Sequence, residues 1–127
     1  MNVTTNINKK DNLRIHKVTG RIVFDKLMEA LNEIYSKPDH NPEMNTLWDL
    51  RDADVSSFPS VQVQHIQSFV SKYWGKSGKS RSALIVSEDV AYGLSRMYEI
   101  MSEGKTAGKI MVFRDYEEAL KWVNSIE

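Results

Sequence analysis

The arrangement of apolar and polar residues along this chain alternates between two patterns, one typical of β-strands and one typical of amphipathic helices. Five short runs have the length and apolar character of β-strands, at 12–18, 21–24, 46–50, 82–86 and 109–113. Four longer segments carry apolar residues every three or four positions, which is typical of amphipathic helices, at 27–35, 63–74, 90–101 and 116–126. The chain therefore reads as two strands followed by alternating helices and strands.

Turn and cap signals mark where these elements end. Thr19-Gly20 separates the first two strand-like runs and predicts a tight hairpin. Residues 1–11 show neither period and are expected to be a flexible lead-in. Asp25, Ser87 and Asp115 stand before helical segments and can cap them by accepting a backbone hydrogen bond.

Alternation of strands and helices predicts the fold class. Such an order favours an α/β protein with mostly parallel strands and right-handed crossovers. We expect one domain over residues 1–127, with a mostly parallel five-stranded sheet, an antiparallel N-terminal edge strand and four helices. The run at 46–50 is the expected central strand, because it is buried in character and turns abruptly into the charged stretch 51–54.

Composition narrows the possible functions. Seventeen basic and seventeen acidic residues cancel, so the chain lacks the positive field of a nucleic-acid-binding protein. Cysteine is absent, which excludes disulfides, thiolate metal sites and cysteine nucleophiles. No apolar run is long enough to span a membrane, and residues 1–11 lack the apolar centre of a signal peptide, so a cytoplasmic location is expected.

Three segments together resemble a known superfamily: 18–22, 47–54 and 89–97, with 112–123 closing the pattern. They are similar to the STAS superfamily, and in particular to small bacterial SpoIIAA-like proteins. The resemblance implies a non-enzymatic regulatory module like the anti-sigma-factor antagonists, which carry Asp-Ser-Ser-Gly after the central strand and are phosphorylated there on serine. Here the matching stretch is Asp54-Val55-Ser56-Ser57, with the aspartate displaced and the glycine missing. Ser56 and Ser57 are therefore phosphorylation candidates by position alone.

The aspartates around the central strand are the other chemical signal. Asp49, Asp52 and Asp54 could serve acid–base chemistry or bind a hard cation, but pairing with Arg51 and capping of the loop is the simpler interpretation. Strict alternation places Asp52 on the same side as Trp48, with Asp49 and Arg51 on the other. We predict no catalytic residue, cofactor or metal site.

Two further motifs carry no chemistry. The stretch 75–80, Gly-Lys-Ser-Gly-Lys-Ser, lacks the upstream glycine of a phosphate-binding loop and leaves a helix instead of entering one. His16, His40 and His65 are more than twenty residues apart and lack metal-ligand spacing.

The third helical segment offers a binding surface. Tyr92 and Arg96 flank its apolar stripe, and Gly93 inside the helix could let a ligand or a neighbouring element approach. A pocket lined by Tyr92, Met97 and Met101, with Arg96 at its mouth, would favour a small amphipathic or lipid-like ligand.

Two functional hypotheses follow from different classes. The first is protein binding in a regulatory role, through a surface that joins Asp52, Asp54, Ser56 and Ser57 to Tyr92 and Arg96. The alternative is binding of the amphipathic ligand. Homodimerisation fits either hypothesis, because a small domain with an edge strand has surface to bury.

Overall fold

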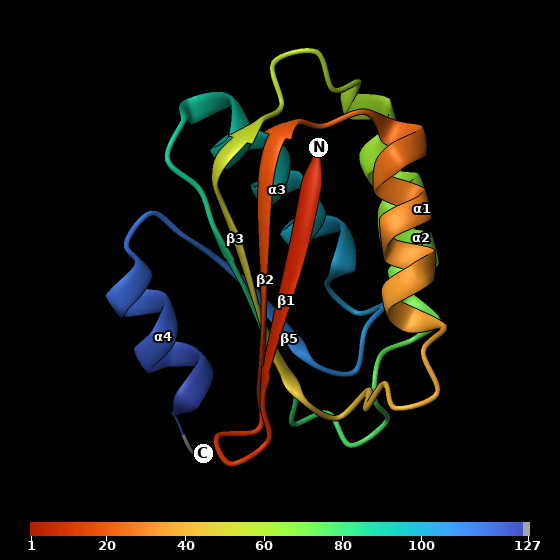
Figure 1. Ribbon diagram of the computed structural model, residues 1–127, viewed down its shortest axis with the longest axis vertical. Coiled ribbons are helices and arrows are strands. Elements are labelled where there is room, and N and C mark those ends of the chain that lie inside the picture. The colour runs from red at the N-terminus through yellow and green to blue at the C-terminus, as the bar shows by residue number, and fades with distance from the viewer. Residues whose placement is uncertain (126–127) are drawn as a thin grey trace.

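The computed structural model describes residues 1–125 as a five-stranded sheet with helices on both faces (Figure 1). Helices α1, α2 and α3 lie on one face, and α4 covers the other. The elements in chain order are β1 (Asn2–Asn8), β2 (Leu13–Arg21), α1 (Phe24–Tyr35), β3 (Asn45–Asp54), η1 (Ser60–Gln62), α2 (Val63–Ser71), β4 (Arg81–Ile85), α3 (Asp89–Ser102), β5 (Lys109–Phe113) and α4 (Tyr116–Asn124).

The strand order in the sheet is the same as the order in the chain, β1-β2-β3-β4-β5. Strands β2 to β5 pair in parallel, and β1 pairs with β2 antiparallel. Right-handed crossovers between sequential neighbours all return on one side, which places α1, α2 and α3 together. The predicted fold class is therefore confirmed. Within residues 1–125, no helix is long and apolar enough to cross a membrane.

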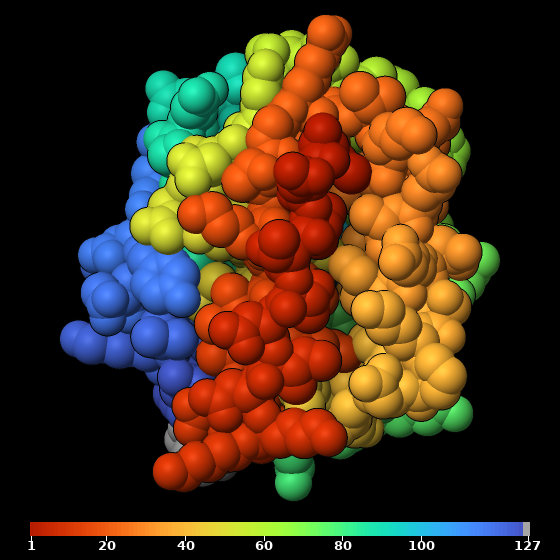
Figure 2. Space-filling view, viewed as in Figure 1, coloured from red at the N-terminus to blue at the C-terminus, as the bar shows by residue number. Residues whose placement is uncertain are grey.

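The N-terminal segment is the first departure from the sequence prediction. Residues 2–8 form edge strand β1, so the expected flexible lead-in is wrong, and the hairpin lies at 9–12 instead of at Thr19-Gly20. Gly20 lies inside β2 instead of in a turn, and its φ of +84° is one that glycine adopts readily. Figure 2 shows β1 on the molecular surface between α4 and α1. An edge strand with both faces largely exposed carries no apolar alternation, which explains why the pattern missed it.

A bulge near the end of β3 is the second departure. Lys17 of β2 pairs with Asp49, but Thr19 pairs with Asp52, so β3 contains one extra residue at this point. The extra residue turns Asp52 away from Trp48 and toward Lys17, whose Nζ lies 3.3 Å from its carboxylate. The predicted placement of Asp52 beside Trp48 is therefore wrong, whereas Arg51 and Asp49 do share the α4 face.

Two apolar cores lie on the two faces of the sheet. Leu47, Ile85 and Val123 are fully buried in the core under α4. Val18, Ile22 and Ala53 form the centre of the core under the three-helix layer. Because the sheet is covered on both faces, the polar residues Arg14 and His16 of β2 are buried, at 6% and 1% exposed. Alternation of Leu13 and Ile15 with Arg14 and His16 is typical of a half-exposed strand, but here the polar positions are covered as well.

Helix caps agree only in part with the sequence prediction. Asp115 caps α4 as predicted, with its Oδ1 accepting from the Glu117 backbone N–H at 2.9 Å. Asp25 lies inside the first turn of α1 and makes no cap bond. The Ser87 hydroxyl instead donates to the Arg51 carbonyl at 2.9 Å, which ties the end of β4 to the end of β3.

Candidate functional site: an apolar cavity beneath three helices

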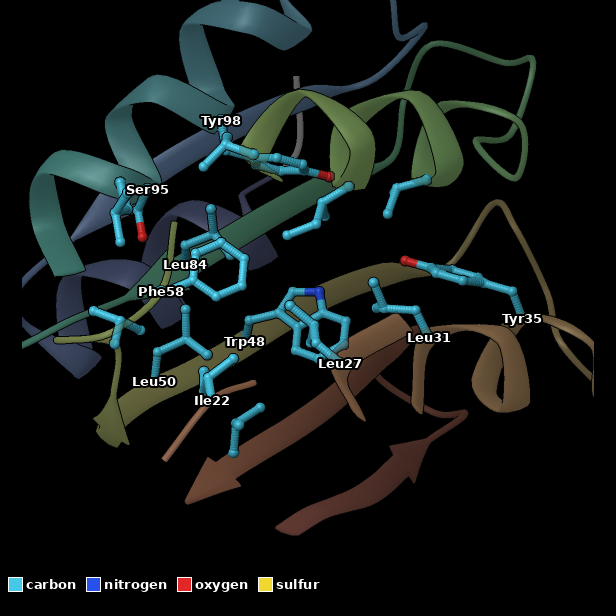
Figure 3. A pocket seen from close by; sticks show the side chains of 16 residues that line it. Ile22, Leu27, Leu31, Tyr35, Trp48, Leu50, Phe58, Leu84, Ser95 and Tyr98 are labelled. Atoms are coloured by element: carbon cyan, nitrogen blue, oxygen red, sulfur yellow. The ribbon is translucent and has the colours of Figure 1, made fainter. Parts of the chain in front are cut away.

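A cavity of about 130 Å³ lies between the sheet and the helices α1, α2 and α3 (Figure 3). Its floor is made by sheet residues Val18, Trp48, Leu50 and Leu84. Its helical walls include Leu27, Leu31 and Tyr35 from α1, Val63, Ile66 and Val70 from α2, and Leu94, Ser95 and Tyr98 from α3. Ile22, Val55 and Phe58 close it near the ends of β2 and β3.

The cavity exists because α1 and α2 stand off from the sheet. Their backbones make few close approaches to any strand, and α2 packs mainly against α3. Side chains do not fill the gap, so Trp48 and Leu50 in the middle of the sheet remain partly exposed. A well-packed interior leaves few voids larger than a water molecule, and a hollow of this size can admit an apolar ligand.

Most of the lining is apolar, with two tyrosine hydroxyls at one end and Ser95 nearer the other. In Figure 3 the hydroxyls of Tyr35 and Tyr98 point from opposite walls toward the same region, and the indole nitrogen of Trp48 faces it from the floor. Among residues 1–125, the hydroxyls of Tyr35, Tyr98 and Ser95 have no hydrogen-bond partner. Burial raises the pKa of Tyr35 to about 12 and raises that of Tyr98 as well, so both phenols stay neutral donors.

A smaller polar hollow of about 30 Å³ adjoins this end of the cavity. Both spaces share Tyr35, Trp48, Val70 and Tyr98 as lining residues. The hollow is also lined by the buried Arg14 and by Trp74 and Ser80, which belong to neither apolar core. Arg14 was not among the predicted site residues, although a cation between Leu13 and Ile15 in a buried strand is an unusual feature.

The predicted loop residues lie at the carboxyl end of β3, outside the cavity. Asp52 pairs with Lys17, and Asp54 Oδ1 accepts from the Ser56 backbone N–H at 2.9 Å. Arg21 Nε donates to Ser57 Oγ at 2.9 Å. All four predicted loop residues are exposed to solvent. The structure thus brings Asp54, Ser56 and Ser57 into one surface loop.

The predicted α3 residues do not line the cavity. Arg114 lies over the Tyr92 ring at 4.6 Å from its centre, and Arg96 pairs with Glu99. The cavity wall from α3 consists of Leu94, Ser95 and Tyr98, so the expected lining by Tyr92, Met97 and Met101 is wrong. Nothing lies within 4 Å of a Cβ built on Gly93, so no neighbouring element among residues 1–125 packs closely against it.

The three aspartates around the end of β3 each have a partner: Asp49 pairs with Arg51, Asp52 pairs with Lys17, and Asp54 accepts a backbone hydrogen bond. Arg51 holds Asp49 with two bonds, Nε to Oδ1 at 2.9 Å and the terminal nitrogen to Oδ2 at 2.8 Å. These bonds lower the pKa of the Asp49 carboxyl against the opposing effect of burial. Within residues 1–125, no three His, Asp or Glu side chains are placed to hold a metal ion.

The geometry defines a small α/β domain with an apolar cavity under a three-helix layer. No protein-family model matches the chain, and no curated protein matches its sequence. The fold is SpoIIAA-like. A crystal structure of an uncharacterised DUF3478-family protein with a SpoIIAA-like fold, from Shewanella loihica PV-4, superposes with a TM-score of 0.59 at 18% identity. The match covers 96% of this chain and 92% of that one.

Proposed function

We propose that this protein binds a small, largely apolar ligand in the cavity between its sheet and helices α1 to α3. The observation that carries the proposal is a cavity of about 130 Å³ whose floor, including Trp48, is left incompletely covered by the protein's own helices. An apolar ligand would remove that surface from water, at roughly 0.8 kcal/mol for each CH₂ group buried. The hydroxyls of Tyr35 and Tyr98 would orient a polar end.

The test is calorimetric titration with decanol, a flexible apolar chain with one hydroxyl. Ser95→Leu should fill part of the cavity and weaken decanol binding by about tenfold or more, because the added side chain occupies ligand space. Ser68→Leu is the matched control, since Ser68 is exposed on α2 and does not line the cavity. Failure of decanol to bind the wild-type protein, or equal affinity in Ser95→Leu, would count against the proposal.

Regulatory protein binding through the loop after β3 is the second candidate. It is supported by the exposure of Ser56 and Ser57 and by Arg21, which already reaches Ser57 and could pair with a phosphate there. Native and denaturing mass spectra of protein purified from its own source separate the two candidates. Mass lost on denaturation supports a ligand, whereas a phosphate-sized increment that survives denaturation supports the loop.

A further inference from the structure

We infer that the ligand is an anionic amphiphile whose carboxylate binds in the polar hollow lined by Arg14, Trp74 and Ser80. This inference rests on the proposed function, because the apolar tail of the same ligand would occupy the larger cavity. It assigns a chemical class to the ligand and a role to three side chains outside the apolar lining.

Three buried hydrogen-bond donors without partners belong to residues that line this one hollow. Arg14 Nε, Trp74 Nε1 and Ser80 Oγ are all inaccessible to solvent and make no hydrogen bond. An N–H of guanidinium or indole can only donate, and the serine hydroxyl can also donate. A buried donor without an acceptor is unfavourable, so three at one place indicate that an acceptor belongs there.

The rest of the Arg14 side chain is firmly held. One terminal nitrogen lies 2.6 Å from His40 Nδ1, and the other donates to the Met44 carbonyl at 3.3 Å and to Thr46 Oγ1 at 3.1 Å. These contacts fix the guanidinium against the sheet and leave Nε without a partner among residues 1–125. A fixed donor loses little freedom on binding, which favours recognition of a planar carboxylate.

The positive charge of Arg14 has no counter-charge nearby. No carboxylate among residues 1–125 pairs with it, and its neighbours Met44 and Thr46 offer neutral oxygens only. His40 and His16 stay neutral, with their pKa lowered to about 4 and about 3, chiefly by burial. A buried cation gains more from an anion than from a neutral acceptor, so a bound water would satisfy the donors but leave the charge uncompensated.

Size and continuity also suit a carboxylate head group. A hollow of about 30 Å³ has room for about two water molecules, or for the two oxygens of one carboxylate. Tyr35, Trp48 and Tyr98 line both spaces, and in Figure 3 their polar atoms point toward one region of the larger cavity. A head group at Arg14 would therefore place its aliphatic chain among Leu31, Leu84 and the other apolar lining residues.

The test compares decanoate with decanol, two ligands with the same chain length and different head groups. By calorimetry near neutral pH, wild-type protein should bind decanoate about tenfold or more tightly than decanol. Arg14→Met should abolish this preference while leaving decanol binding within about threefold. Arg21→Met is the matched control, because Arg21 lies on the same strand but is exposed, and it should keep the preference.

The possible results distinguish a failure of the carboxylate site from a failure of apolar ligand binding. If wild-type protein binds decanol and decanoate equally, the carboxylate site is wrong and apolar binding stands. If Arg14→Met keeps the preference for decanoate, the assignment to Arg14 is wrong. If neither ligand binds, both proposals fail. Should Arg14→Met not fold, Trp74→Phe with Ser80→Ala removes two of the three donors, and an unchanged decanoate preference in that variant would overturn the inference.

Discussion

Glu99 Oε1 accepts a hydrogen bond from the backbone N–H of Val112 at 3.0 Å, so a side chain of α3 occupies part of the free edge of β5. The same carboxylate pairs through its other oxygen with Arg96. Since β5 is the last strand of the sheet, its outward N–H groups could otherwise pair with another chain. Glu99 thus satisfies a backbone donor and limits edge pairing at one position.

Replacing Glu99 by alanine should destabilise the protein. We expect Glu99→Ala to lower the free energy of unfolding by about 1 to 2 kcal/mol, because the charged acceptor of the Val112 N–H is lost. Urea denaturation measures the change. Glu33→Ala, at an exposed position of α1, is the control and should stay within about 0.5 kcal/mol of wild type. A Glu99→Ala protein as stable as this control would show that the edge bond contributes nothing.

Replacing Gly93 by alanine should stabilise the protein. Gly93 lies inside α3, its φ is not positive, and a Cβ added there meets no atom within 4 Å. Alanine should therefore raise the free energy of unfolding by about 0.5 to 1 kcal/mol through helix propensity alone. Gly20→Ala provides the contrast, because its φ of +84° should make the same change destabilising. A loss of stability in Gly93→Ala would reveal a steric role for this glycine.

His16 should make stability depend on pH below neutrality. Burial is the main reason that its pKa falls from 6.5 to about 3, and its ring lies 4.3 Å from that of Trp48. The unfolded chain therefore binds a proton that the folded chain does not, so stability falls as the pH drops below about 6.5. From pH 7 to pH 5 we expect a loss of roughly 2 kcal/mol from this group. In His16→Gln this part of the dependence of unfolding free energy on pH should disappear. An unchanged dependence on pH would show that His16 is not its source.

Asp49 should stabilise the protein at neutral pH and lose this effect only in strong acid. Its folded pKa lies below the ordinary value of 3.8 because Arg51 donates two hydrogen bonds to it. Its contribution is therefore present above that value and is lost as the pH falls through the folded pKa. We expect Asp49→Asn to cost about 1 to 2 kcal/mol at neutral pH, with the difference from wild type shrinking in acid. Asp52→Asn removes only an exposed pair with Lys17 and should cost less than about 0.5 kcal/mol.

The sequence predicted those elements whose buried side chains recur at regular positions. Strands β3, β4 and β5 and the four helices have such patterns, and their predicted order is correct. The separate strand predicted at 21–24 is wrong, because β2 runs through Gly20 to Arg21 and α1 begins at Phe24. Strand β1 has few buried side chains, so no periodicity marked it. The bulge before Asp52 is a matter of register between two strands, which the pattern of one strand does not specify.

The candidate site was harder to predict than the fold. The residues that line the cavity, such as Leu84 and Tyr98, have the same apolar character as ordinary core residues. What makes them a site is the distance between the α1 and α2 backbones and the sheet, and no local sequence pattern encodes that distance. Arg14 is the sequence feature that could have indicated the site, because a charged residue between two apolar neighbours in a covered strand needs a partner.

The sequential strand order has a consequence for how this chain folds during synthesis. All three crossover helices return to one face, so Leu47 and Ile85 on the other face depend on α4 alone for cover. Until residues 116–124 have left the ribosome, the nascent sheet presents that apolar face to water or to a chaperone. The domain can therefore reach its native state only after its last helix has emerged, however early the strands have paired.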